Sequence, residues 1–144
     1  MSFKEISAGG VVYRHDADGQ MQIQLITDRY GKISFAKGKQ ESGETIEETA
    51  LREILEETGV VGVIDKPIDI IAYTYNHTVH GEVDKEVHYY LVESKGGELR
   101  PQIEEIRGVA WYEPKEAWEK QQKSGYDNND FILEKALKLL GVEL

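Results

Sequence analysis

The segment 38–60, GKQESGETIEETALREILEETGV, constrains the fold more than any other stretch of this chain, because it specifies a helix from end to end. Thr45 is followed three residues later by Glu48, the pattern of a capping box at a helix N-terminus. Gly59 is a typical residue at which a helix ends, because glycine adopts the left-handed C-cap conformation without strain. The sequence therefore predicts a helix from about Ile46 to Thr58.

The charged and the apolar residues of this predicted helix fall on different sides. Each residue turns by about 100° around a helix axis, so residues at i, i+3 and i+4 share one face. The glutamates with this spacing are Glu53, Glu56 and Glu57. The apolar residues expected to point the other way, and to pack against a sheet, are Leu51, Ile54 and Leu55.

This carboxylate face admits two interpretations. One is a solvated helix stabilised by i,i+4 pairs. The other is a cation site, because converging carboxylates raise one another's pKa and a hard divalent cation such as Mg²⁺ or Mn²⁺ relieves their repulsion. Glu44 can reach the same region, and Arg52 can hold a carboxylate in one orientation with its planar guanidinium.

The residues before the helix favour the cation site. Gly38 opens a loop that lets the backbone approach an anionic ligand closely. The lysines that flank this loop are Lys32, Lys37 and Lys39.

Outside this helix, β-rich segments mix with two further helical patterns, which predicts an α/β or α+β fold with a mixed sheet covered by helices. The 144 residues are enough for one domain, 1–144. In the last helical pattern, Phe131, Leu133, Leu137 and Leu140 are expected to lie near one face. The expected strands are 6–14, 21–27, 33–35 and 106–113, with a hairpin of 67–81 and 85–94 around GEVD at 81–84; the expected helices are 114–122 and 128–141.

Composition excludes several classes of function. The net charge of −10 disfavours binding to a nucleic-acid duplex, which needs a basic face. No apolar run is long enough to cross a bilayer, and the N-terminus lacks the pattern of a secretory signal. The absence of cysteine excludes disulfides and thiolate catalysis. A cytoplasmic protein without membrane contact is expected, and the oligomeric state stays open.

The segment 38–60 resembles the Nudix box, G-x5-E-x7-R-E-U-x-E-E-x-G-U, in which U is a bulky aliphatic residue. The resemblance implies an α/β/α sandwich that presents the box as loop, helix and loop. It also implies an enzyme that uses water and Mg²⁺ or Mn²⁺ to hydrolyse a phosphoanhydride bond in a nucleoside diphosphate linked to another group. The residues that match the motif are Gly38, Glu44, Arg52, Glu53, Ile54, Glu56, Glu57, Gly59 and Val60.

The resemblance also implies roles for individual residues. Glu56 and Glu57 correspond to the main metal ligands, and Glu53 corresponds to a ligand, a base or both. Arg52 would orient a carboxylate of this set. The residues expected to support the metal from outside the helix face are Glu44 and, through its backbone carbonyl, Lys37.

The general base varies in position within this family. The segment QIEEIRGVAW offers Glu104 and Glu105 just before a predicted strand, and Glu105 is the favoured candidate. A pair of solvated loop carboxylates is the alternative.

The substrate class is indicated only by residues around the box. SFAKGKQESGE resembles the entrance of diadenosine and diphosphoinositol polyphosphate hydrolases, although Ala36 stands where proline is usual. Tyr75, with Tyr73 as its neighbour, resembles a tyrosine that stacks on a base, and packing within the fold is the alternative. The other expected substrate contacts are Lys39, Lys85, which is otherwise a solvated hairpin charge, and Tyr126 as a second stacking residue.

The leading expectation is a metal-dependent dinucleoside polyphosphate hydrolase acting on a small-molecule nucleotide. The alternatives within the family are nucleoside triphosphates, ADP-ribose, diphosphoinositol phosphates and 5′-triphosphate RNA. A non-catalytic nucleotide sensor is a further alternative, although every box glutamate is present. His77 and His80 form an H-x-x-H pattern in a predicted strand or hairpin, so no histidine metal site is expected.

Overall fold

The computed structural model describes residues 3–102 and 106–143. Strands and helices are mixed along the chain, as expected. The elements in chain order are β1 (Phe3–His15), β2 (Met21–Asp28), β3 (Ile33–Ser34), β4 (Lys37–Lys39), α1 (Ile46–Thr58), β5 (Val60–His77), β6 (Gly81–Gly97), β7 (Ile106–Tyr112), α2 (Pro114–Ser124), the 3₁₀ turn η1 (Asp127–Asn129) and α3 (Asp130–Leu139).

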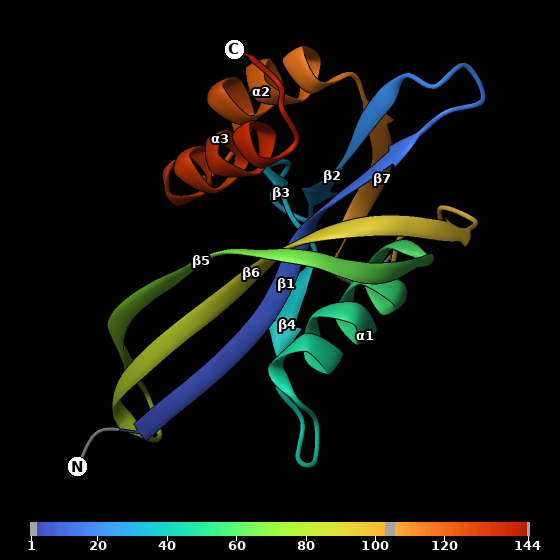
Figure 1. Cartoon of the computed structure of the whole chain (residues 1–144). Helices are drawn as coiled ribbons and strands as arrows, with labels where there is room; N and C mark the ends of the chain where they lie inside the picture. Colours follow the sequence, from blue (N-terminus) through green and yellow to red (C-terminus); the bar gives the residue numbers. More distant parts are fainter. Residues whose placement is uncertain (1–2, 103–105, 144) are drawn as a thin grey trace.

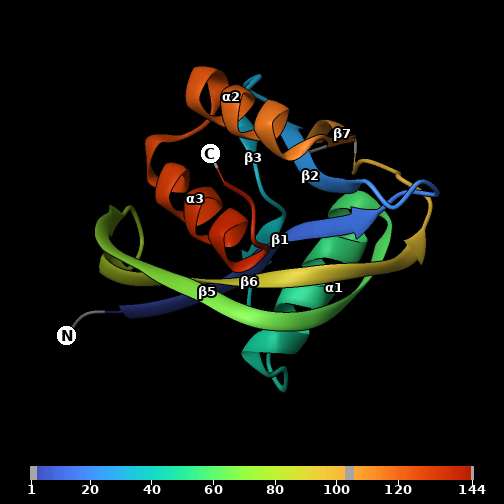
Figure 2. The ribbon, with the colours of Figure 1, turned by 45° about the horizontal axis from the view of Figure 1, so that its top comes forward.

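The strands form one seven-stranded sheet with the order β3-β2-β1-β6-β5, in which β4 also pairs with β1 and β7 pairs with β2. β1 runs parallel to β6, whereas the other pairs are antiparallel, so the sheet is mixed. Helix α1 covers one face of this sheet, and α2 and α3 cover the other (Figure 1; Figure 2). The expected α+β class with a mixed sheet is therefore confirmed.

Two hydrophobic cores lie on the two faces, and alternation along the strands supplies both. On β6, Tyr89 and Leu91 pack in the core beneath α2 and α3, whereas Tyr90 and Val92 pack against α1. Successive side chains of a strand point to opposite faces, so a strand covered on both sides is apolar at nearly every position. Each helix layer is thus held by burial of its own apolar side.

Helix α1 begins and ends where the sequence predicts. The Thr45 hydroxyl accepts a hydrogen bond from the Glu48 backbone N–H at 3.1 Å, and Glu48 Oε1 accepts one from the Thr45 backbone N–H at 2.9 Å. Gly59 has a φ of 82°, and its N–H donates to the Leu55 carbonyl at 2.9 Å. A Cβ at Gly59 would lie 2.2 Å from the Glu98 carbonyl oxygen, so glycine is needed there for space as well as for conformation.

Two predicted apolar faces need correction. Leu55 is 46% exposed, because the sheet covers α1 through Ile54 and Ala50, one turn apart. In α3, Phe131 is 45% exposed, so its predicted place on the buried face with Leu133 and Leu137 is wrong. The buried positions of α3 are Ile132, Leu133, Ala136 and Leu137.

The long hairpin also departs from its predicted form. The segment 81–84 was expected to lie between two strands, but it belongs to β6, and the turn lies at 78–80. β5 begins directly after α1 and forms an edge of the sheet. The hairpin tip lies beside the start of β1 in both ribbon views (Figure 1; Figure 2). β1 and β6 are parallel there, with Phe3 opposite Val83.

None of the helices in residues 3–102 and 106–143 has the length and apolar character needed to cross a bilayer.

Candidate active site

Strand β4 passes directly over the carboxylate face of α1, and Gly38 makes this close approach possible. A Cβ on Gly38 would lie 2.2 Å from the carboxyl carbon of Glu53 and within 2.5 Å of both its oxygens. Any side chain at this position would displace the Glu53 carboxylate. The glycine of the motif is therefore a requirement for space, which places the backbone of β4 beside the glutamates of α1.

Arg52 holds several groups of this region in one arrangement. Its Nε donates to Glu44 Oε2 at 2.5 Å, and its Nη1 donates to Glu53 Oε1 at 2.8 Å and to Glu56 Oε2 at 3.1 Å. Nη2 donates to the Lys39 backbone carbonyl at 2.9 Å. The arginine thus links the loop before α1, the strand β4 and the carboxylate face, and this geometry supports its expected orienting role.

These contacts set the acidity of the glutamates in opposite directions. The hydrogen bond from Arg52 lowers the pKa of Glu44 to about 2, and the same bond raises the pKa of Arg52. Burial raises the pKa of Glu53, although the hydrogen bond from Arg52 opposes this. Glu44 is therefore held ionised beside the arginine, whereas burial shifts Glu53 toward the protonated form.

The three expected metal ligands differ in exposure. Glu57 is 4% exposed, Glu53 is half-buried and Glu56 is exposed. The carboxyl groups of Glu53 and Glu57 share a hydrogen bond, so two oxygen-donor groups already meet at low exposure.

The donor chemistry, all carboxylate oxygen, fits a hard divalent cation. Within the described residues, no three acidic or histidine side chains converge as a ready metal centre. Arg52 engages Glu53 and Glu56 instead. Glu56 would have to leave the arginine to join the other two carboxylates.

A cavity of about 450 Å³ opens beside Glu57. Lys37 lines it next to this carboxylate; burial lowers the pKa of Lys37, and the nearby charge of Lys85 lowers it further. Asp28 and Asn129 supply polar groups elsewhere in the wall. Its aromatic wall consists of Tyr30, Phe35, Tyr73, Tyr89 and Tyr126.

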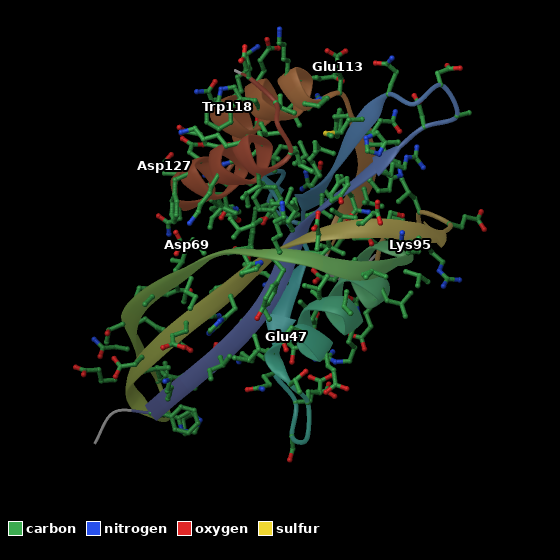
Figure 3. The ribbon with its side chains drawn as sticks, in the orientation of Figure 1. Glu47, Asp69, Lys95, Glu113, Trp118 and Asp127 are labelled. Atoms are coloured by element: carbon green, nitrogen blue, oxygen red, sulfur yellow. The ribbon has the colours of Figure 1, made fainter. Side chains whose placement is uncertain are left out.

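Tyr126 is fixed at this cavity by Asp28. The Tyr126 hydroxyl donates a short hydrogen bond to Asp28 Oδ2, and Lys32 Nζ lies 4.9 Å from the centroid of its ring. Asp28 Oδ1 also accepts hydrogen bonds from the backbone N–H groups of Tyr30 and Lys32, at 2.9 and 3.0 Å. Figure 3 labels Asp127, the next residue, beside α2 and α3, and Glu47 on α1 on the other side of the sheet. Glu57 of α1 and Tyr126 before α3 both line the cavity, which therefore combines groups from the two helix layers.

Asn129 is a polar group of the cavity that the sequence did not reveal. It is 4% exposed and lines the cavity, and within residues 3–102 and 106–143 its side-chain amide makes no hydrogen bond. Buried amides are normally hydrogen-bonded, so this group is available to a ligand. The sequence did not indicate Asp28 either, because a lone aspartate at a strand end carries no signal of function.

The remaining expected substrate residues gather around Glu5. The Tyr75 hydroxyl donates to Glu5 Oε2 at 2.8 Å, Lys85 Nζ lies 3.0 Å from Oε1, and Lys39 Nζ lies 3.6 Å from Oε2. Tyr75 is absent from the cavity wall, whereas its neighbour Tyr73 lines it. Their roles in substrate binding stay predictions.

Glu104 and Glu105, proposed from the sequence as base candidates, lie outside the described residues. Lys37 was expected to contribute its backbone carbonyl; the structure adds that its side chain faces the cavity beside Glu57. The sequence identified Lys37 as a charge flanking the loop, but it did not reveal the position of this side chain beside Glu57.

Known proteins resemble this chain over most of its length. A model of the NUDIX domain family matches residues 5–133. A protein of Mycobacterium tuberculosis (strain CDC 1551 / Oshkosh) named "Putative mutator protein MutT4" is 40% identical over 114 residues, which are 74% of this chain and 45% of that protein. An 8-oxo-(d)GTP phosphatase of Mycolicibacterium smegmatis is 29% identical over 109 residues, 76% of this chain and 32% of that protein. The chain thus spans less than half the length of either relative.

Solved structures share the fold. The Ap4A hydrolase of C. elegans, in a binary complex, matches with a TM-score of 0.72 and 22% sequence identity, covering 95% of this chain and 98% of that one. At this identity the likeness concerns the fold alone. It confirms the expected sandwich of helices around a mixed sheet.

Proposed function

The chain belongs to the NUDIX family, and from this premise we propose that it hydrolyses a phosphoanhydride bond in a nucleoside diphosphate linked to another group. One observation carries the proposal. Glu57 belongs to the carboxylate face of α1 and also lines the aromatic cavity. A phosphate chain can therefore meet the glutamates while the attached base lies in the cavity.

Nudix hydrolases generally need a divalent metal ion, and we assign Mg²⁺ or Mn²⁺ to the side chains of Glu53, Glu56 and Glu57. Such an ion lowers the pKa of a bound water and screens charge on the phosphoryl oxygens. The Lys37 carbonyl and Glu44 would complete or support the site. Arg52 keeps Glu44 ionised and holds Glu53 under β4, which limits the positions that the ligands can take.

Proton removal from the attacking water is assigned to Glu53 or to Glu105. Burial raises the pKa of Glu53, which brings this carboxyl group closer to the basicity that a general base needs near neutral pH. Glu105 stays the alternative that the sequence proposed.

Recognition of the nucleoside is assigned to the cavity. Tyr73 and Tyr126 line it with faces on which a base can stack, which is worth about 1–3 kcal/mol per base. The Asn129 amide offers both a donor and an acceptor to the edge of that base. Lys85 lies close enough to Lys37 to lower its pKa, and both lysines would offset the charge of the phosphates.

Within this reaction class, we propose a dinucleoside polyphosphate such as diadenosine tetraphosphate as the substrate. The KG form of the box entrance and the lysines Lys39 and Lys85 support it, because they extend positive charge beyond the cavity. A second candidate is an oxidised purine nucleoside triphosphate. The buried Asn129 amide favours it, since it can read a changed base edge, and one relative is named an 8-oxo-(d)GTP phosphatase.

The test is a product screen with purified protein and Mg²⁺ or Mn²⁺. Diadenosine tetraphosphate, 8-oxo-dGTP, ADP-ribose and GTP would be compared by their kcat/KM values, and products identified by chromatography. We expect ATP and AMP from diadenosine tetraphosphate, the result of water attack near one end of the chain. Efficient cleavage of 8-oxo-dGTP with no cleavage of diadenosine tetraphosphate would select the second candidate. Cleavage of no nucleotide would overturn the proposal.

A further inference from the structure

A second hollow, of about 520 Å³, lies where the start of β1 meets the tip of the β5–β6 hairpin. Phe3, His77 and His80 line one part of it, and Glu5 and Lys39 line another. None of these described residues lines the aromatic cavity beside Glu57. Lys39 connects the hollow to the box, because its carbonyl accepts a hydrogen bond from Arg52 at 2.9 Å. The hollow therefore lies near the phosphate-binding region but apart from the proposed base site.

The wall of this hollow is a platform of flat rings. The Phe3 and His80 rings are stacked, with centroids 4.4 Å apart and planes 9° from parallel, and His77 lies 4.8 Å from His80. His77 Nδ1 accepts hydrogen bonds from the backbone N–H groups of Val79 and His80, at 3.0 and 3.3 Å, which fixes the turn that carries these rings. Phe3 is nevertheless 47% exposed, so part of its apolar surface has no partner among the described residues.

A row of rings on β5 joins the platform to the cavity. The centroids of Tyr73 and Tyr75 are 6.3 Å apart, and those of Tyr75 and His77 are 6.4 Å apart. Alternate residues of a strand share a face, and a rise of about 3.3 Å per residue separates Tyr73 from His77 by about 13 Å. Tyr73 lines the cavity and His77 lines the hollow. The two recesses are thus the two ends of one aromatic surface.

Positive charge lies between the two recesses. Lys85 and Lys39 both pair with Glu5, at 3.0 and 3.6 Å, and Lys85 lies close enough to Lys37 to lower its pKa, which burial already lowers. Two lysines and the Tyr75 hydroxyl offset the single charge of Glu5. Lys37, Lys39 and Lys85 therefore supply three cations along the path between the rings, and Glu5 is the carboxylate that pairs with two of them.

We propose that this hollow binds the second nucleoside of a dinucleoside polyphosphate, with its base on the Phe3–His80 pair while the first base occupies the cavity. This inference rests on the proposed function and names a part of the substrate that the cavity alone cannot hold. Bases of every kind stack on aromatic rings, so the platform favours a nucleoside without selecting one base. A mononucleotide has no second ring to place there.

The experiment compares two substrates that differ in the second nucleoside. Diadenosine tetraphosphate and adenosine 5′-tetraphosphate have the same number of phosphates, but only the first has two bases. In Phe3→Ala and in His80→Ala, we expect the KM for diadenosine tetraphosphate to rise about 5- to 150-fold relative to the KM for adenosine 5′-tetraphosphate. His80→Phe keeps a flat ring and should restore most of the ratio.

Val79→Ala is the matched control, because Val79 lies in the same turn, is exposed and lines neither recess. Both KM values should stay unchanged in this variant. Equal changes in both KM values for Phe3→Ala and His80→Ala would overturn the inference and leave the proposed function standing.

If the wild-type protein cleaves neither compound, the proposed function fails, and calorimetry decides the inference. Diadenosine tetraphosphate that binds more tightly than adenosine 5′-tetraphosphate in the presence of Mg²⁺, with the difference lost in His80→Ala, would support the second site. Equal affinities would overturn it.

Discussion

The carboxylate face of α1 and the aromatic surface that runs along β5 are assembled in different ways. The first is built from residues 38–57, which a capped helix and one short strand bring together through Arg52. The second takes residues from β2, β4, β5, β6 and the turn before α3, which are far apart in the chain. The reaction is thus assigned to the local motif of residues 38–57, and substrate choice to the aromatic surface along β5. A family can keep the catalytic motif while the substrate surface varies.

The largest expected effect is the loss of all activity on metal removal. Treatment with a chelator should abolish turnover, and Mg²⁺ or Mn²⁺ should restore it, because the glutamates of α1 repel a phosphate chain unless a cation lies between them, and that cation also lowers the pKa of the attacking water. Turnover is measured by product chromatography, and circular dichroism checks that the fold survives. Full turnover in a sample verified as metal-free would show that the carboxylate face of α1 does not act by binding a metal ion.

Glu57→Gln should reduce kcat by at least about 10²-fold, because it removes a charged oxygen ligand while keeping the size of the side chain. The melting temperature should not fall, since the new amide can still donate a hydrogen bond to the neighbouring Glu53 carboxylate. Glu119→Gln, an exposed glutamate on α2, is the matched control and should have no effect on kcat. A near-normal kcat in folded Glu57→Gln would contradict the assignment.

Gly38→Ala tests how sharply the local region is positioned. The new Cβ would collide with the Glu53 carboxylate, the flexible end of a side chain, so that carboxylate should move while the fold is kept. Misplacement by about 1 Å can cost up to about 100-fold in rate, so we expect a fall in kcat of about 10- to 100-fold with little change in melting temperature.

Gly108→Ala serves as the control for Gly38→Ala, because a Cβ at Gly108 meets no atom within 4 Å. A large loss of stability in Gly38→Ala with normal kcat per folded molecule would show that the glycine serves the fold and not the site.

The smallest expected effect concerns the tertiary surface. Tyr73→Ala should raise the KM for adenosine 5′-tetraphosphate by at least about 5-fold with a smaller change in kcat, because stacking acts on binding. Tyr73→Phe keeps the ring and should retain most of the affinity. Tyr75→Ala removes a ring outside the cavity wall, so it should raise the KM for adenosine 5′-tetraphosphate less than the KM for diadenosine tetraphosphate. A larger rise of the KM for adenosine 5′-tetraphosphate in Tyr75→Ala than in Tyr73→Ala would show that the base stacks on Tyr75, as the sequence predicts.

Several features of the site could be predicted because they depend on neighbours in sequence. The bounds of α1, its capping box and its C-cap glycine follow from hydrogen bonds between residues three or four apart. The shared face of Glu53, Glu56 and Glu57 follows from helix geometry, and so do the contacts of Arg52 with Glu53 and Glu56, one and four residues away.

Other features could not be predicted, because they depend on which surfaces meet. The position of the β5–β6 turn was missed, since both 78–80 and 81–84 contain residues compatible with a turn or a strand. The exposure of Leu55 and Phe131 depends on how far the sheet extends beneath each helix. Asn129 gave no signal, because an asparagine before a helix is usually a solvated cap.

The sequence by itself determined the local motif: where α1 begins and ends, which glutamates share its face, and that a glycine precedes them. Only the tertiary structure decided that Lys85 and Tyr75 contact Glu5, a residue 70 or more positions away, and that Tyr73, rather than Tyr75, lines the cavity. Helix caps and faces are set by hydrogen bonds and rotations within a few residues. The partners of a strand residue are instead set by the register of strands far apart in the chain, here the parallel pairing of β1 with β6, and a shift of one residue would turn every side chain to the other face.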